Sequence, residues 1–301
     1  MKAFRYLVLP LALTLTLDIG SLYAQQSDST GLPGDNFSLE GALELFRKAA
    51  NPEDFERLLN TESNHVNNLD LDGDGKIDYI RVVGKKDDDA TIFILQVPVT
   101  ANENQDIAVI EIETTGKESA SIQIIGDEEI FGEAIIVEPG SSDDNAVATT
   151  FTRGPSVDEI DLNENAIINV WLWPSVRYVY APGYRGWISP WRWNAYPGWW
   201  KPWHPVRWHA FHPYRVGYRR GFAIVHTHRL ARAHKMYTPI RTTSVVVRNR
   251  NVVAHKNYTV NRTRTTVTGP RGNSVTRKTT TVKNKRGNVK ARKSTVRKRR
   301  H

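Results

Sequence analysis

The sequence predicts an α+β fold in which N-terminal helices pack on an antiparallel β meander, followed by an irregular aromatic segment and a largely disordered basic tail. Apolar residues recur at helical spacing early in the chain, and runs rich in β-branched residues follow, separated by short polar breaks. The composition then changes twice. All 9 Trp fall between residues 171 and 208, and residues 166–301 contain 30 Lys and Arg but no carboxylate.

The first 24 residues predict a secretory signal peptide. Lys2 and Arg5 precede an apolar run over residues 6–17, and Ala24 marks the expected cleavage site. The run is shorter than the roughly 20 apolar residues that span a bilayer. We therefore expect an exported protein, periplasmic or associated with the outer envelope, without a transmembrane span. The sequence contains no cysteine, which excludes disulfides.

Two helices are predicted after a polar linker over residues 25–37. Ser38 can cap the first helix, and Asn51 can cap the second, with Pro52 at its first position. Residues 38–165 are expected to form one acidic domain, since residues 25–165 hold 31 Asp and Glu against 9 Lys and Arg. Its strands are expected over residues 79–84, 91–99, 107–112, 119–125 and 131–137, with residues 160–170 as a candidate for one more.

A nine-residue segment between these helices and strands has the pattern of a calcium loop. Asp70, Asp72 and Asp74 alternate, so their carboxylates can converge on one hard cation. Lys76 can add its backbone carbonyl, Asp78 closes the set, and the glycine between Asp74 and Lys76 permits a sharp turn. The competing interpretation is an acidic turn, in which Asp and Gly serve turn geometry alone. Because carboxylates this close repel one another without a cation, we expect calcium here, in a structural role.

The spacing is similar to the first nine positions of an EF-hand loop. Arg81, however, stands where that loop has its bidentate Glu, and a strand is expected to follow in place of a helix. In this respect the segment resembles the loops of the FG-GAP and VCBS repeats of β-propellers. The resemblance implies that the fourth Asp ligates directly. A single copy implies no propeller.

Further patterns resemble an uncharacterised family of exported bacterial envelope proteins. They are VNNLDLD (66–72), DYIR (78–81), QVPV (96–99), WPSVRYVY (173–180) and SPW (189–191). The resemblance implies export and the same architecture, and it brings no activity. The sequence has no nucleophile elbow, phosphate-binding glycine loop or zinc-protease helix. Glu111 and Glu113 share one face of a strand, which we interpret as a solvated face rather than a catalytic pair, so an enzyme is not predicted.

Residues 166–240 form a basic segment rich in Trp, Pro and His. Prolines every few residues exclude a long helix, and aromatic side chains this dense must pack on something. Three interpretations stay open: the segment wraps the acidic domain or a partner copy, its rings sit at a membrane interface, or they stack on sugars or bases. Six His lie between residues 204 and 234, including His226 and His228. They could bind zinc or copper, although polar filling and anion contacts are the commoner roles.

Residues 241–301 form a polycationic, low-complexity tail. A two-fold repeat places Gly-Asn turns at residues 272–273 and 287–288, which could form hairpins, although the charge density favours disorder. Its cations need anionic partners: the acidic domain itself, an anionic envelope polymer or lipid surface, or non-specific nucleic acid. We expect a non-enzymatic calcium-binding protein that docks on anionic envelope surfaces. The alternative is a sequence-independent nucleic-acid or lipopolysaccharide binder that the acidic domain regulates.

Overall fold

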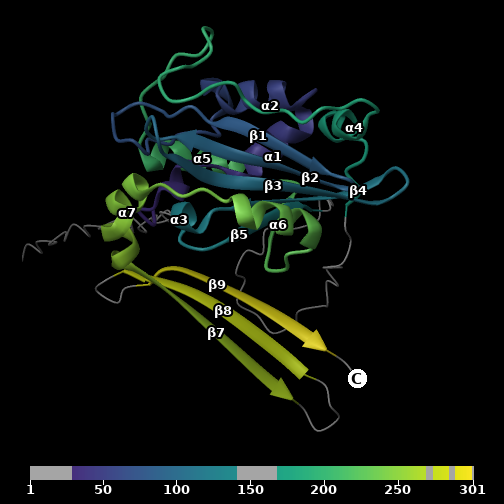
Figure 1. Cartoon of the computed structure of the whole chain (residues 1–301). Coiled ribbons are helices and arrows are strands. Elements are labelled where there is room, and N and C mark those ends of the chain that lie inside the picture. The colour runs from purple at the N-terminus through teal and green to yellow at the C-terminus, as the bar shows by residue number, and fades with distance from the viewer. Residues whose placement is uncertain (1–28, 141–167, 269–273, 285–288, 300–301) are drawn as a thin grey trace, which may run out of the picture.

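The computed structural model describes residues 29–140, 168–268, 274–284 and 289–299, with side chains up to residue 255. Its largest element is a six-stranded antiparallel sheet in the order β1-β2-β3-β4-β5-β6 (Figure 1). The α+β fold with N-terminal helices on an antiparallel sheet is confirmed. The strands are β1 (Arg81–Asp87), β2 (Ala90–Pro98), β3 (Asn104–Gly116), β4 (Ser119–Gly126), β5 (Ile135–Pro139) and β6 (Phe222–Val225).

The first two helices, α1 (Leu39–Lys48) and α2 (Pro52–Leu59), begin at the predicted caps. Ser38 accepts a hydrogen bond from the Gly41 N–H, and Asn51 accepts one from the Asp54 N–H. No helix among the described residues is both long and apolar enough to cross a membrane. The other helical elements are η1 (Pro33–Asn36), η2 (Glu62–Asn64), α3 (Glu128–Phe131), α4 (Pro174–Tyr180), α5 (Trp208–Tyr218), α6 (Ala231–Tyr237), η3 (Thr238–Ile240) and α7 (Val245–Asn257).

One strand prediction needs correction. Phe131 ends helix α3 instead of starting a strand, because Asp127 caps that helix by accepting from the Glu129 N–H. The following strand, β5, therefore begins only at Ile135. Of the candidate strand over residues 160–170, residues 160–167 lie outside the described part of the chain, and residues 168–170 are not in a strand.

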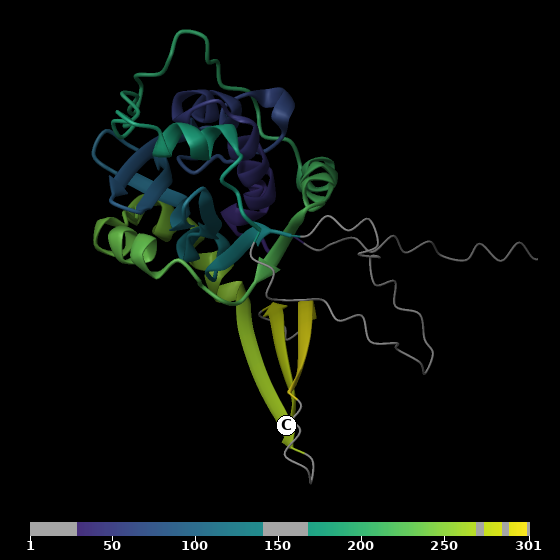
Figure 2. The same cartoon turned by 90° about the vertical axis from the view of Figure 1, so that its right-hand side faces the viewer.

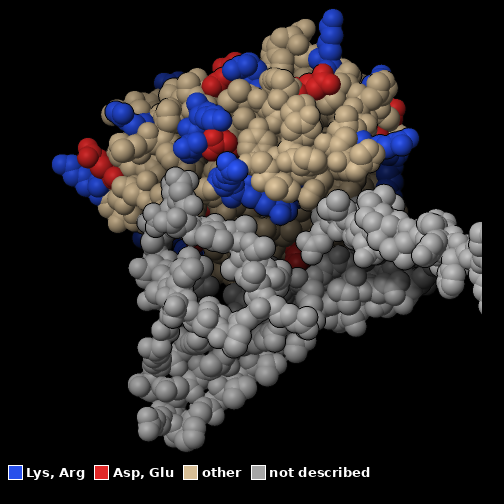
Figure 3. All heavy atoms as spheres, turned by 180° about the vertical axis from the view of Figure 1, so that it is seen from behind, with Lys and Arg blue, Asp and Glu red and all other residues tan. Residues whose placement is uncertain are grey.

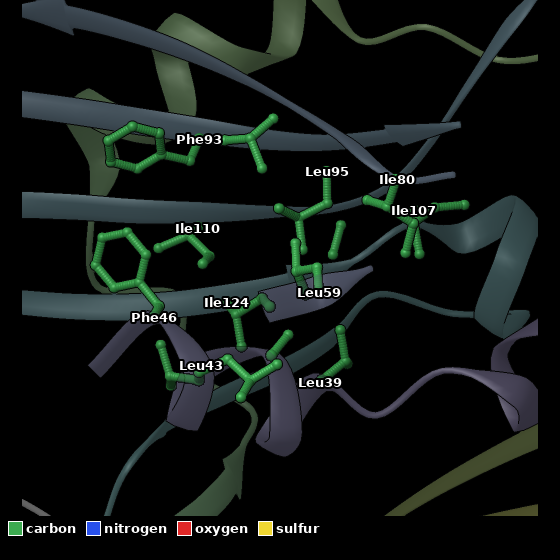
Figure 4. Packing of buried hydrophobic residues seen from close by; sticks show 14 of the residues in the cluster. Leu39, Leu43, Phe46, Leu59, Ile80, Phe93, Leu95, Ile107, Ile110 and Ile124 are labelled. Atoms are coloured by element: carbon green, nitrogen blue, oxygen red, sulfur yellow. The ribbon is translucent and has the colours of Figure 1, made fainter. Parts of the chain in front are cut away.

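The main core lies between one face of the sheet and the helices α1, α2 and α4 (Figure 1). Figure 4 shows Leu43 and Phe46 of α1 packing towards Phe93 and Ile110 of the strands, with the rings of Phe46 and Phe93 5.4 Å apart. A smaller cluster, which includes Ile92, lies on the opposite face under α6. The alternation of side chains along β2 and β3 therefore feeds two separate cores.

The part of the basic half between residues 168 and 257 belongs to the same folded unit. β6 is the sixth strand of the sheet, and Val176 and Val247 lie in the main core, so the change of composition at residue 165 is not a boundary of the core. On the face shown in Figure 3, lysine and arginine side chains stand beside acidic ones. Among the residues whose side chains are described, five arginine–carboxylate pairs join the two halves: Arg219–Glu40, Arg229–Glu138, Arg232–Asp89, Arg241–Asp127 and Arg248–Glu129.

The last part of the tail forms a second antiparallel sheet. It consists of β7 (Tyr258–Thr268), β8 (Ser274–Asn284) and β9 (Val289–Arg299), in that order. In both Figure 1 and Figure 2 this sheet projects away from the main body beyond α7. The Gly-Asn turns predicted at residues 272–273 and 287–288 lie outside the described residues.

A buried carboxylate ties β3 to the segment before α7. Asp106 is fully buried and accepts hydrogen bonds from the Thr242 N–H at 2.8 Å, the Gln96 side-chain amide at 2.6 Å and the Tyr237 hydroxyl at 3.2 Å. Burial raises the pKa of this carboxyl from 3.8 to about 6, against the effect of these donors. The folded protein thus holds the Asp106 proton at a pH where the unfolded chain has lost it.

Asp106 is therefore expected to make the protein less stable as the pH rises. Because the pKa of Asp106 is higher in the folded protein than in the unfolded chain, its protonated carboxyl contributes its full stabilisation below pH 3.8. This stabilisation is lost as the pH rises to about 6. The fall in the free energy of unfolding that Asp106 causes is on the order of 3 kcal/mol at most. Urea unfolding between pH 4 and 7 measures it, and Asp106→Asn should flatten the slope while lowering stability at every pH. Equal slopes in the two proteins would contradict this assignment.

Candidate metal-binding loop

The acidic loop connects the N-terminal helices to β1. Its base is closed by a hydrogen bond from the Asp78 N–H to the Leu69 carbonyl at 2.8 Å. Gly73 and Gly75 have φ angles of 72° and 82°, in the left-handed region that glycine adopts without strain. The sharp turn predicted at Gly75 is confirmed.

Asp70, Asp72 and Asp74 come together as the spacing predicts. Each offers one carboxylate oxygen, and these three atoms lie within 4.8 Å of one another. The N–H groups of Gly75, Asp74 and Lys76 orient the three carboxylates at 3.1, 3.0 and 2.8 Å respectively. Asp70 Oδ1 is buried and has no hydrogen-bond partner among the described residues. A buried carboxylate oxygen without a donor is costly, and a bound cation would supply the partner.

Asp78 does not join this group. Asp78 is 8% exposed, and its carboxylate accepts a hydrogen bond from the Leu71 N–H, so it stabilises the base of the loop. Burial raises the pKa of Asp78 to about 8, and the charges of Asp72 and Asp70 act in the same direction. Lys76 is exposed and gives its N–H to Asp74. The structure thus brings together three of the four predicted carboxylates, and it places the fourth in a supporting position.

One arginine lies against the loop. Arg250 of α7 donates to the Leu71 carbonyl at 3.3 Å, and a Cβ added to Gly73 would come within 1.9 Å of its guanidinium. Glycine at position 73 is favoured by its left-handed backbone angle, while the flexible Arg250 side chain could shift to make room for a Cβ. Burial raises the pKa of Asp72, whereas the charge of Arg250 acts in the opposite direction. The arginine offsets only part of the repulsion among the carboxylates.

The far side of the loop holds the aromatic segment. The Ile77 N–H donates to the Trp203 carbonyl at 2.8 Å, and His204 Nδ1 lies 2.8 Å from the Gly75 carbonyl. Just beyond the loop, the ring of Tyr79 packs edge-on against Trp200, with centroids 5.1 Å apart. The conformation of the acidic loop therefore sets where residues 200–204 lie.

A second polar cluster on β3 was not foreseen. Glu111 is fully buried rather than solvated, because residues 228–234 fold over its face of the sheet. Its carboxylate contacts His228 and His234, whereas His226 is not part of the group. The only signal for this cluster in the sequence was the density of histidines, which did not indicate that Glu111 would join them. More than one hundred residues separate Glu111 from either histidine.

The comparisons with known proteins give no match, so the argument for function rests on the geometry of the site. The resemblance to exported envelope proteins stays a prediction. No family model matches the sequence, and neither a curated protein nor a solved structure matches the chain.

Proposed function

We propose that this protein is a calcium-stabilised binding protein that docks on anionic lipid surfaces of the cell envelope. The observation that carries the proposal is the pair of hydrogen bonds from the acidic loop to Trp203 and His204. Through them, an ion that orders the loop also orders the aromatic segment. The proposal assigns no catalytic residue.

The docking surface would be an aromatic ledge made of Arg192, Trp193, Trp199 and Lys201. The two rings are 37% and 52% exposed, and both cations are exposed as well. Amphipathic rings favour the headgroup level of a membrane, and Lys and Arg are attracted to anionic headgroups. Trp200 is buried against Tyr79, and the ring of Trp199 lies 6.3 Å from that of Tyr79, so Trp199 stands on a packed base. This arrangement favours a surface ligand over a ligand held in a deep cleft.

Asp70, Asp72 and Asp74 would hold the calcium ion, and waters would complete the six to eight oxygen ligands that it takes. Asp78 and the Lys76 carbonyl remain proposed members of the set, and either would join by a local adjustment of the loop. The buried Asp70 Oδ1 supports an ion rather than a bare turn. Without the ion, repulsion among the carboxylates would loosen the Gly75 and Ile77 contacts and release the ledge.

Binding to vesicles tests the proposal on the full-length protein. Calcium should raise the melting temperature by several degrees and increase sedimentation with phosphatidylglycerol vesicles relative to chelator. Asp72→Asn should remove both calcium effects, whereas Asp87→Asn, an exposed acid on β1, should keep them. Trp199→Ala should weaken vesicle binding about tenfold with an unchanged melt, and Leu172→Ala, 78% exposed and outside the ledge, should have no effect.

Two outcomes would overturn the proposal. A melting temperature that does not respond to calcium would show that the acidic loop is a turn without a bound ion. Equal vesicle binding by the native protein, Trp199→Ala and Leu172→Ala would remove the ledge from the docking surface.

A second candidate is a polyanion binder that the acidic half regulates. The five ion pairs between the halves support it, because they already occupy arginines that a polyanion would otherwise contact. DNA or lipopolysaccharide in place of vesicles separates the two candidates. Binding that falls steeply with salt and survives Trp199→Ala would favour the polyanion.

A further inference from the structure

The buried cluster on β3 lies on the face of the sheet opposite to α1 and α2. Glu111 belongs to β3, His228 precedes α6, and His234 is part of α6. The side chain of Glu111 is 0% exposed, while those of the two histidines are 25% and 47% exposed. The cluster therefore has a buried base and a side that opens to solvent.

The three side chains already converge on one point. His228 Nε2 lies 2.5 Å from one carboxylate oxygen of Glu111, and His234 Nδ1 lies 3.1 Å from the other. The two imidazole rings meet edge-on with centroids 4.2 Å apart. One ligand atom from each residue falls within a 4.8 Å group.

Gln123 of β4 fixes the position of His228. This buried amide accepts from the Arg229 N–H at 2.9 Å and donates to the Thr227 carbonyl at 3.0 Å. The backbone is therefore pinned on both sides of His228. A side chain clamped in this way loses little freedom when it binds a ligand.

Glu113 fixes the position of His234. Two residues beyond Glu111 on the same face of β3, it accepts from the Ala233 N–H at 2.9 Å, in the first turn of α6. The helix is thus fastened to the strand one residue before His234. Both histidines are oriented by groups outside the cluster, which is the arrangement expected of a preformed site.

We propose that Glu111, His228 and His234 form a binding site for a divalent transition-metal ion, with zinc as the best match. Two imidazole nitrogens and one carboxylate oxygen are a zinc ligand set that leaves a fourth position for water or another ligand. Zinc bonds of about 2.0–2.1 Å place neighbouring tetrahedral ligands about 3.3 Å apart, so small side-chain rotations suffice. Hard cations such as calcium prefer all-oxygen sites, so this site and the acidic loop would take different ions.

Calorimetric titration of the chelator-treated full-length protein with zinc tests the site. We expect one tight zinc site, whose affinity falls at least a hundredfold in His228→Ala and in His234→Ala. His209→Ala, an exposed histidine on α5, and Asp72→Asn, in the acidic loop, should retain it. Cobalt should give the visible absorption of a low-symmetry, tetrahedral-like site in the native protein and lose it in Glu111→Gln, which keeps the side-chain volume. Circular dichroism verifies that each variant is folded.

Zinc affinity that is equal in His234→Ala and the native protein would overturn the proposal. So would the absence of any zinc binding that His228→Ala weakens. In either case the cluster would be a hydrogen-bonded contact that holds α6 to the sheet.

Discussion

Removal of residues 241–301 is expected to destabilise the whole domain, whereas removal of residues 258–301 should leave it folded. Arg241 forms a two-contact ion pair with the buried Asp127. Next to it, the Thr242 N–H donates to the Asp106 carboxylate, and the Asp106 N–H donates to the Thr242 carbonyl. Val247, 1% exposed, is part of the main core. Removal of Arg241 alone would leave the buried Asp127 carboxylate without its cation, at a cost on the order of 3 kcal/mol. The melting temperature should therefore fall by about 10 °C or more.

Thermal unfolding of the full chain and the two truncated proteins, followed by circular dichroism, measures this difference. The shorter deletion removes only β7–β9, which project beyond α7 in Figures 1 and 2. It should leave the melt within a few degrees of the full chain. Equal melts for both truncated proteins would show that the segment around Arg241 adds nothing to the core. A test of the tail in surface binding should accordingly use the shorter deletion.

Replacement of Glu56 by alanine is expected to cost about 3–5 kcal/mol. The carboxylate is 2% exposed and accepts four hydrogen bonds. One oxygen accepts from the hydroxyls of Tyr79 and Ser189, and the other from the Val82 N–H and the Trp187 indole N–H. Alanine would leave these donors buried without an acceptor. The aromatic segment would also lose its attachment to α2.

Glu56→Gln should be much milder, at about 1 kcal/mol, because the two oxygens have different partners. The amide oxygen can keep the Val82 and Trp187 N–H donors, while its NH₂ group faces hydroxyls that can turn to accept. Glu53→Ala, an exposed position on the same helix, is the matched control. Urea unfolding of the three variants provides the measurement. If glutamine and alanine cost the same, the negative charge itself is required at this position.

Local signals in the sequence predicted the local structure well. Ser38 and Asn51 cap the helices as expected because the capping interaction involves residues only three apart. Asp70, Asp72 and Asp74 converge for the same reason, since the turn at Gly75 brings near neighbours together. Asp78 could not be placed by spacing, because its orientation depends on the burial of the loop base.

Contacts between segments that are far apart in the chain could not be predicted from the sequence. The pairing of β5 with β6 and the contact of Glu111 with His228 join residues about 80 to 120 positions apart. Nothing in the local pattern says which strand will be the neighbour of a four-residue run such as Phe222–Val225. The aromatic segment was expected to pack on something, and its partner, the carboxylate of Glu56, became identifiable only in three dimensions.

The late position of β6 has a consequence for the order in which the chain can fold. The strands from β1 to β5 are synthesised first, and they carry most of the acidic residues while their basic partners are still to come. Until residues 222–247 emerge from the ribosome, the β5 edge has no neighbour and Asp106, Glu111 and Asp127 have no covering segment. Mutual repulsion would keep such a nascent chain open and soluble. We therefore expect the fold to be completed only when the C-terminal half is available, so that neutralisation and closure of the sheet occur together.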